Sequence, residues 1–169
     1  SVYGGVDYRS KASAKLMLQN NQYARYYLGR PSVFTNITFD ANSNYVIAAQ
    51  FNPVTFDTGC SMTVSYYLYL VGGYQGTAPY GMSLSQDSSI TINSGRYHFI
   101  CGSSRGDYTN SYTGNADISI SGSATLINYL YAGTGDNAYG AGGADITIEN
   151  GTIYRVYGKG QGVNGTMSG

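Results

Sequence analysis

Two aspartates occupy the same place in a repeated stretch of sequence. Asp117 precedes Ile-Ser-Ile, and Asp145 precedes Ile-Thr-Ile in the next copy of the repeat. If the repeats stack as neighbouring parallel strands, the two carboxylates lie about 5 Å apart. Carboxylates at that separation suit a retaining glycosidase, or a Ca²⁺ site with hard oxygen ligands. Asp136, beside Asn137, and Glu149 are further candidate ligands for such an ion.

A purely local role is the simpler interpretation of Asp117 and Asp145. The side chain of an aspartate at the entrance of a strand commonly accepts a hydrogen bond from the backbone of its own turn. That role needs neither a metal nor a substrate, and it is the one that the sequence favours. We therefore expect no cofactor, and Ca²⁺ is the one ion that these acids would suit.

An Arg-Gly-Asp tripeptide runs from Arg105 to Asp107, within a polar segment that is typical of an exposed loop. In eukaryotic adhesion, such a loop presents a guanidinium and a carboxylate to an integrin. Three common residue types also meet by chance, so the tripeptide alone is a weak signal. Arg105 and Asp107 are candidate ligand-binding residues on this ground only.

Four tyrosines lie between the predicted strands, in inserts rich in Gly, Ser, Asn and Asp: Tyr80, Tyr108, Tyr112 and Tyr139. A tyrosine ring stacks on the apolar face of a sugar while its hydroxyl remains available for hydrogen bonding. Inserts between strands are also where solenoid proteins carry their binding residues. These tyrosines are therefore candidate glycan-binding residues, although the chain has no Trp to strengthen such a platform. Tyr23, Tyr45 and Tyr97 are instead expected within strands.

The two cysteines and the single histidine do not form a catalytic pattern. On the repeat template, Cys60 aligns with Arg96, and Cys101 lies five positions further along. That offset is roughly 16 Å along a strand, beyond the roughly 7 Å between Cα atoms that a disulfide tolerates. We therefore expect two thiols, at least one of them buried. His98 and Cys101 are three residues apart, which places them on opposite faces of a strand, so His98 is expected to be a structural or surface side chain.

The elements that must position these residues form a repeat. Its three clearest copies share an Ile-x-Ile alternation, a small turn containing Gly, and a second apolar and aromatic strand that ends at a further Gly. They are Ser89–Gly102, Asp117–Gly133 and Asp145–Gly158. Strict alternation predicts half-buried strands, and Gly or Asn beside them supplies the conformations that end a strand.

Less regular copies begin at Leu16, Ile37 and Val54. The segment Ala12–Tyr27 is also rich in residues that favour helix, but its Leu16-Met17-Leu18 alternation favours strands. The interval between Ile37 and Val54 is short for a whole repeat, so we expect these two to be strands of one turn. The chain is thus predicted to form five to six coils.

The repeats keep one order and one polarity, which favours a parallel coil, or β-solenoid, over a meander of hairpins. Parallel stacking places equivalent positions about 4.8 Å apart and builds ladders of like side chains. Two inward ladders and one outward ladder are predicted: Ile90–Ile118–Ile146, Ile92–Ile120–Ile148 and, on the outside, Thr91–Ser119–Thr147.

The last repeat, Ile146–Gly160, contains Asn150-Gly151-Thr152 and Val156-Tyr157-Gly158, and Val2-Tyr3-Gly4-Gly5 looks like the end of a preceding one. These units resemble the repeats of large extracellular, adhesin-like proteins of gut-type Gram-positive bacteria. The resemblance implies an all-β, right-handed parallel β-helix, similar to the pectate-lyase architecture, in surface-anchored arrays. It covers the second half of the chain well and the first half loosely. It also implies an extracellular or cell-surface location.

Composition excludes several classes of protein. Charged residues make up 11% of the chain, and nine acids balance nine bases. That balance argues against electrostatic binding to nucleic acid or to anionic lipid. The apolar stretches are too short to span a membrane, so no membrane insertion is expected. Residues 1–169 are expected to be a single β-solenoid domain, and a fragment of a longer repeat protein.

The expected function is that of a structural or adhesive segment of a bacterial extracellular surface protein, which presents loops from a rigid β-helix. One alternative is a carbohydrate-binding module with Tyr-lined insert loops. Another is a polysaccharide lyase or glycoside hydrolase on the same fold, although the few clustered acids do not favour an enzyme. The expected partner is a glycan or a host or cell-surface ligand. Exposed terminal coils also predict self-association.

Overall fold

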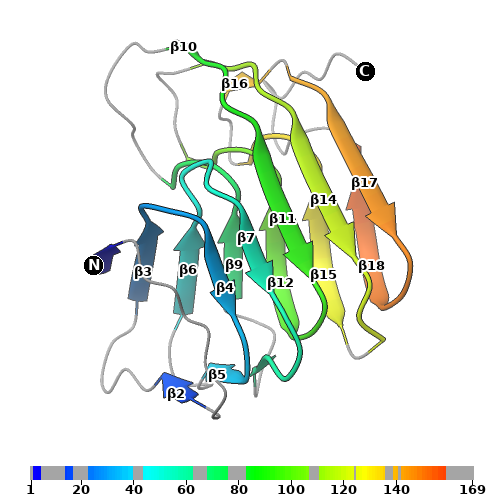
Figure 1. Cartoon of the computed structure of the whole chain (residues 1–169). Helices are drawn as coiled ribbons and strands as arrows, with labels where there is room; N and C mark the ends of the chain where they lie inside the picture. The colour runs from blue at the N-terminus through cyan, green and yellow to red at the C-terminus, as the bar shows by residue number, and fades with distance from the viewer. Residues whose placement is uncertain are drawn as a thin grey trace.

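The protein consists of parallel β-strands (Figure 1). The computed structural model describes residues 2–4, 14–16, 23–39, 44–62, 68–75, 83–106, 111–123, 125–135, 139–140 and 142–158. Within these ranges the regular structure is all strand, and every strand pairs in parallel with its neighbours. The described residues contain no helix with the length and apolar character needed to cross a membrane. The all-β, parallel architecture predicted from the sequence is therefore confirmed.

Two sheets form the body of the molecule. The broad sheet has seven strands in the order β1 (Val2–Gly4), β3 (Tyr23–Leu28), β6 (Asn44–Ala48), β9 (Leu68–Val71), β12 (Arg96–Cys101), β15 (Leu126–Tyr131) and β18 (Thr152–Tyr157). The facing sheet has five, in the order β4 (Ser32–Phe34), β7 (Val54–Phe56), β11 (Ser88–Ile92), β14 (Ala116–Ile120) and β17 (Ala144–Ile148). Figure 1 shows the facing sheet in front of the broad sheet, with the strands of the two layers running in opposite directions.

Short strands form two further sheets, which lie at opposite ends of the long strands. At one end lies a sheet of β2 (Ala14–Leu16), β5 (Ile37–Phe39) and β8 (Ser61–Met62). At the other end lies a sheet of β10 (Ser83–Leu84), β13 (Ser111–Tyr112) and β16 (Tyr139–Gly140). The chain follows the broad sheet in one direction, returns along the facing sheet, and begins again beside its previous strand. One circuit is defined here as the chain from one facing-sheet strand to the next.

Unequal circuits explain the uneven spacing of the repeats. Early circuits pass through the β2–β5–β8 sheet, whereas late ones pass through the β10–β13–β16 sheet at the opposite end. The circuit between β7 and β11, whose register pairs Val54 with Ile90, contains both β8 and β10 and is longer than its neighbours. The later circuits are equal in length, because Ile118 pairs with Ile90 on one side and with Ile146 on the other.

The first half of the chain confirms some expectations and corrects others. Residues 14–16 and 23–28 are strands, as predicted. Ile37 lies in β5 and Val54 in β7, two different sheets, so they are not equivalent positions of successive repeats. The alignment of Leu16 with Ile37 is wrong by two positions, because Leu16 pairs with Phe39.

The predicted alignment of Cys60 with Arg96 is also wrong. Cys60 precedes β8, a short strand that the later circuits lack, whereas Arg96 begins β12 of the broad sheet. The expected outcome for the cysteines nevertheless holds, because both are buried thiols. The sulfur of Cys60 donates to the carbonyl of Phe34 at 3.3 Å, and that of Cys101 donates to the carbonyl of Gly133 at 3.0 Å.

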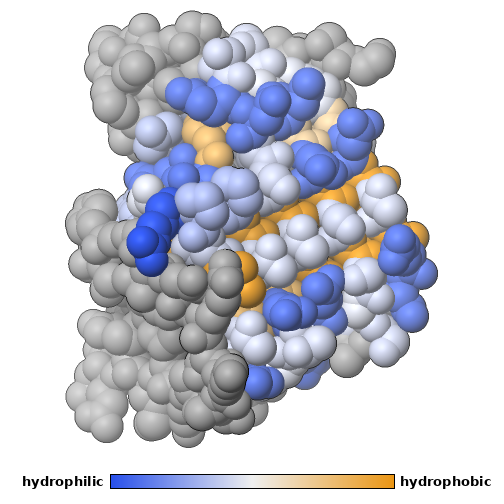
Figure 2. All heavy atoms as spheres, viewed as in Figure 1, coloured by the Kyte–Doolittle hydropathy of each residue, from blue (hydrophilic) through white to orange (hydrophobic). Residues whose placement is uncertain are grey.

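The predicted ladders are all present. Ile118 pairs in register with Ile90 on one side and with Ile146 on the other, and the neighbouring outward and inward positions follow the same register. The isoleucines of β11 and β14 are almost fully buried between the two sheets. Figure 2 shows the outer face of the facing sheet, where pale rows of intermediate hydropathy cross the strands between orange hydrophobic rows.

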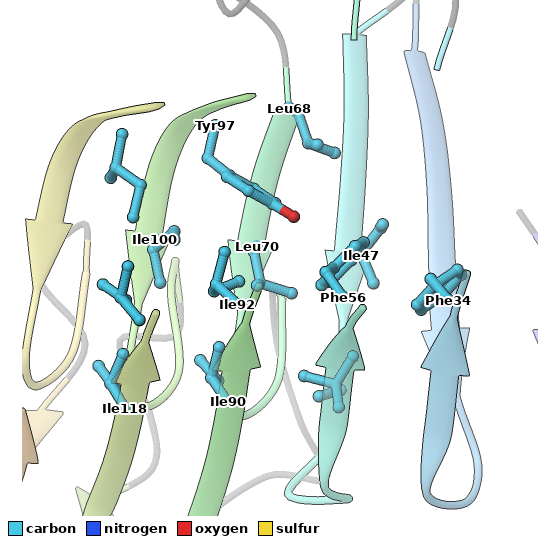
Figure 3. Packing of buried hydrophobic residues seen from close by; sticks show 14 of the residues in the cluster. Phe34, Ile47, Phe56, Leu68, Leu70, Ile90, Ile92, Tyr97, Ile100 and Ile118 are labelled. Carbon is cyan, nitrogen blue, oxygen red and sulfur yellow. The ribbon is translucent and has the colours of Figure 1, made fainter. Parts of the chain in front are cut away.

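The core lies between the two sheets and follows the same stacking (Figure 3). The rings of Phe34 and Phe56, in adjacent strands, are stacked with centroids 4.7 Å apart. Tyr97 meets Phe56 edge to face from the broad sheet, at 5.4 Å. Its hydroxyl donates to the carbonyl of Ser94 at 2.8 Å, so this buried polar group is satisfied. Burial raises the pKa of Tyr97 well above its ordinary value, with a smaller effect from Cys60.

Polar side chains link successive circuits at both ends of the facing sheet. Before the strands, Asp87 Oδ1 accepts from the backbone N–H of Asn115 at 2.7 Å, and Asn115 Oδ1 accepts from that of Gly143 at 2.8 Å. After the strands, Asn93 Nδ2 donates to Asp57 Oδ1 at 3.2 Å, and Ser121 Oγ donates to Asn93 Oδ1 at 2.7 Å. Hydrogen bonds between circuits therefore extend beyond the strands themselves.

Glycine is required where the late circuits turn into the broad sheet. Gly95 and Gly151 have φ of 108° and 106°, in the left-handed region that side chains disfavour. A Cβ at Gly95 would also lie 2.7 Å from the hydroxyl oxygen of Tyr97. The expected turn glycines therefore serve both backbone conformation and packing.

Replacing Ile118 by alanine should destabilise the protein by about 2–5 kcal/mol, because it opens a cavity in the middle of an isoleucine ladder. The matched change Ser119→Ala, on the outward ladder at the next position, should alter the free energy of unfolding by no more than about 0.5 kcal/mol. Urea unfolding of the two variants and the unchanged chain measures both. Equal effects at the two positions would contradict the assignment of inward and outward faces.

Candidate binding surface

The outer face of the broad sheet carries a cluster of aromatic side chains, here called the aromatic surface. Its members are Tyr69, His98, Phe99, Tyr129, Tyr131 and Tyr157. In β9, Tyr69 lies between the core residues Leu68 and Leu70 and so faces outward. In β12, the core residues Tyr97 and Ile100 are three positions apart, and His98 and Phe99 between them both contact the outer cluster. This break in alternation places two successive ring side chains of β12 on the outer face.

The rings of successive circuits stack on one another. Phe99 and Tyr131 have ring centroids 4.8 Å apart, and Tyr131 and Tyr157 are parallel to within 6° at 4.6 Å. Tyr69 lies 5.9 Å from Phe99 on the other side. Tyr69 and Phe99 are register partners, as are Tyr131 and Tyr157, so the spacing of about 4.8 Å between neighbouring strands brings their rings close together. Phe99 and Tyr131 are instead a diagonal pair, because the register partner of Tyr131 is Cys101.

His98 lies between two of these rings. Tyr69 and Tyr129 each meet its imidazole edge to face, with centroids 5.4 Å away. Asn128 Nδ2 lies 3.3 Å from His98 Nδ1. An amide nitrogen only donates, so this contact requires Nδ1 as acceptor and the proton on Nε2. Burial lowers the pKa of His98, and the positive charge of Arg105 lowers it further. The neutral imidazole is therefore the form that this environment favours.

Two guanidinium groups lie on the same rings. That of Arg105 is 4.9 Å from the ring centre of Tyr69 and 5.2 Å from that of Phe99. Its Nη1 donates to Gln75 Oε1 at 3.4 Å. The guanidinium of Arg155 lies 5.3 Å from the ring centre of Tyr129. Such contacts stabilise by about 0.5–2 kcal/mol, more as they are shielded from water.

The rings of the aromatic surface therefore contact one another and the guanidinium groups of Arg105 and Arg155. The large exposed aromatic side chains in the described part of the chain are Tyr154, 66% exposed, and Tyr157, 38% exposed, both in β18. The surface as built holds neighbouring circuits together from outside, much as the isoleucine ladders do from inside.

The residues of the predicted ligand-binding set occupy different places. Arg105 is half-buried, with its guanidinium on the aromatic surface, and its backbone bridges to Gln75 and Gly135. Tyr112 is 1% exposed, and its ring lies 5.9 Å from that of Phe51, so its face is not presented to solvent. Tyr80, Tyr108 and Asp107 lie outside the described residues, as does the side chain of Tyr139.

The structure brings the predicted pair of aspartates together. Asp117 and Asp145 are register partners on adjacent strands, as expected, and both are exposed. On its other side Asp117 is paired with Ser89, so the run of acidic register partners does not extend to β11. Asp136 lies outside the described residues. Within the described ranges, no three His, Cys, Asp or Glu residues come together in a group that would hold a metal ion.

Sequence reasoning missed the aromatic surface, although a signal for it was present. Tyr69, Phe99 and Tyr129 follow one another at equal intervals and are register partners in β9, β12 and β15. The signal was hidden because strict alternation assigns Phe99 to the same face as the core residue Tyr97. The evenly spaced ladder of Asp87, Asn115 and Gly143 was likewise present in the printed sequence.

The geometry is thus that of stacked circuits with side-chain ladders inside, outside and at both ends. Comparison with protein-family models, curated proteins and solved structures finds no match to this chain. The function of the chain therefore has to be inferred from its own residues.

Stability should depend on pH through His98, the one histidine of the chain. Its pKa is lowered in the folded state, so the unfolded state binds the proton first as the pH falls below about 6.5. The free energy of unfolding should therefore be largest above that pH and decrease as the pH falls toward the lowered value. In His98→Asn, the decrease between about pH 7 and pH 5 should be reduced.

Urea unfolding across this range, with NMR titration of the imidazole, tests the prediction. An imidazole pKa at or above the ordinary 6.5 would contradict it, and so would an unchanged pH dependence in His98→Asn.

Proposed function

We propose that this chain is a section of a right-handed parallel β-helix that serves as a structural or adhesive segment of a bacterial extracellular surface protein. The seven strands of the broad sheet give six coils when counted from strand to strand. The role of the stack is to hold adjoining segments at fixed spacing and to present loops from a rigid support. Its partner is a glycan or another ligand on a cell surface.

The observation that carries this proposal is the coincidence of the sequence repeat with the structural circuit. Residues 116–120 and 144–148 read Ala-Asp-Ile-Ser-Ile and Ala-Asp-Ile-Thr-Ile and pair position by position. Each circuit is one unit that buries its apolar side chains only against its neighbours, so the stack grows by addition of units. A fold that lengthens in this way suits a spacer.

Several contacts support the rigidity that such a spacer needs. The rings and guanidinium groups of the aromatic surface connect circuits from outside. Side-chain hydrogen bonds that involve Asp87 and Asp57 connect circuits at the two ends of the facing-sheet strands. Neighbouring circuits are therefore joined by backbone, apolar and polar contacts together.

The placement of the connections supports the presentation of loops. The segments between β12 and β13 and between β15 and β16 both leave the broad sheet at its end nearer the β10–β13–β16 sheet. Parallel bridges of Arg105 with Gln75 and with Gly135 hold the starts of these connections beside one another. The starts of these connections therefore have fixed positions on the support.

The proposal is tested by locating the protein on cells. An antibody raised against the folded chain should label intact cells of the bacterium that encodes it, as strongly as it labels permeabilised ones. An antibody to a cytoplasmic protein, which should label permeabilised cells only, is the control. Labelling by the first antibody only after permeabilisation would overturn the proposal.

A further inference from the structure

The turn between β17 and β18 contains an Asn-Gly pair, Asn150-Gly151. Figure 1 shows this turn in orange, where the chain passes from the facing sheet to the broad sheet. The backbone nitrogen of a glycine has no side chain beside it, so it is open to attack the amide of a preceding asparagine. Reactions of this kind make asparagine a thermally labile residue. A second such pair, Asn164-Gly165, lies outside the described residues.

The side chain of Asn150 is folded onto its own backbone. Gly151 N–H donates to Asn150 Oδ1, with the nitrogen and the oxygen 2.9 Å apart. Asn150 Cγ is one bond of about 1.2 Å from that oxygen, so it lies within about 4 Å of the Gly151 nitrogen. Reacting atoms about 3–3.5 Å apart are close to the geometry of attack. A rotation of the side-chain amide therefore brings Cγ, in place of Oδ1, in front of the nitrogen.

Backbone hydrogen bonds fix both ends of this turn. Glu149 N–H donates to the carbonyl of Ile120 at 2.8 Å, and Thr152 N–H donates to that of Thr125 at 2.9 Å. The glycine N–H between them donates instead to the asparagine side chain. The reacting nitrogen is thus positioned by anchored neighbours, and its own hydrogen bond is to the group that it would attack.

The matching turn two circuits earlier is held differently. It joins β11 to β12, it also has three residues, and Gly95 in it has a left-handed φ like that of Gly151. Ser94 occupies the place of Asn150. Ser94 is buried, and its hydroxyl donates to the carbonyl of Asp57 in another circuit. Asn150 is exposed among the described residues, and its side chain contacts its own backbone.

We propose that Asn150 is a site of spontaneous deamidation, with the Gly151 nitrogen as the nucleophile. The nitrogen bonds to Asn150 Cγ, its proton passes through water to Nδ2, and the Cγ–Nδ2 bond breaks to release ammonia. Water then adds to either carbonyl of the cyclic imide and opens it, which leaves aspartate or isoaspartate at position 150. The net reaction consumes a water molecule and releases ammonia, with no oxidation or reduction. The proposal does not depend on the proposed cellular role.

The reaction changes both the charge and the length of the turn. Either product adds a negative charge beside Glu149, which is itself exposed. Isoaspartate also adds an atom to the main chain, because the chain then runs through the side chain. Since both ends of the turn are fixed by backbone hydrogen bonds, three residues have to accommodate the longer main chain.

Incubation of the folded chain at mildly alkaline pH, followed by peptide mass spectrometry, tests this proposal. Replacement of NH2 by OH should accumulate at position 150, and faster at higher pH, because the nitrogen attacks once it has lost its proton. Asn93 is the control within the same chain. It precedes a serine, and its side chain is hydrogen-bonded to Asp57 and Ser121, so it should stay intact.

The synthetic peptide Asp145–Arg155 measures the same reaction without the fold. Position 150 should react in the folded chain at least as fast as in the peptide. A slower reaction in the folded chain would overturn the proposal, because the fold would then hold the two atoms apart. Modification of Asn93 to the same extent as Asn150 would overturn it too.

Asn150→Ser introduces the residue that the matching turn carries at this place. On incubation, the unchanged chain should gain an acidic form, resolved by ion-exchange chromatography, that this variant lacks. The same acidic forms in both chains would count against the proposal. If the variant does not fold, as judged by circular dichroism, the comparison of Asn150 with Asn93 in the unchanged chain still decides.

Discussion

Parallel pairing of each circuit with the next is the constraint on which the rest of this structure depends. It places equivalent residues about 4.8 Å apart, so the nearest neighbour of most side chains is its counterpart one circuit away. Apolar counterparts suit such a column, as Ile90, Ile118 and Ile146 show, and so do stacked rings such as Phe34 and Phe56. Charged counterparts repel one another, which gives a physical reason for a charged fraction of only 11%. Asp117 and Asp145 are tolerated because both are exposed to water.

The same constraint decides which groups are available to a partner. On the aromatic surface, rings pack on one another, and the guanidinium groups of Arg105 and Arg155 lie over the rings of Tyr69 and Tyr129. Among the described strands, those of the last circuit, β17 and β18, have a neighbour on one side only. The exposure of Ile148 and Val156 is thus a direct consequence of the way in which the core is built.

The sequence predicted the second half of the fold because its repeats share an Ile-x-Ile alternation and are evenly spaced. Register between β11, β14 and β17 followed from Ile-x-Ile alone. The alignment of Cys60 was wrong because the circuit between β7 and β11 contains a short strand, β8, that no local sequence pattern predicts. The outward position of Phe99 was missed because a break in alternation depends on backbone shape. The position of Arg105, folded onto Tyr69, depends on a contact between residues of different circuits, which no local spacing encodes.

Cross-linking across two circuits tests the parallel register most directly. In the chain carrying Asp117→Cys and Asp145→Cys, the two Cα atoms are about 5 Å apart, within the range that a disulfide spans. In the chain carrying Asp117→Cys and Thr147→Cys, an offset of two positions raises this distance to about 8 Å. Mild oxidation should therefore form a disulfide in the first chain and not in the second, as judged by mass spectrometry of tryptic peptides. Cross-linking of the second chain in preference to the first would contradict the account.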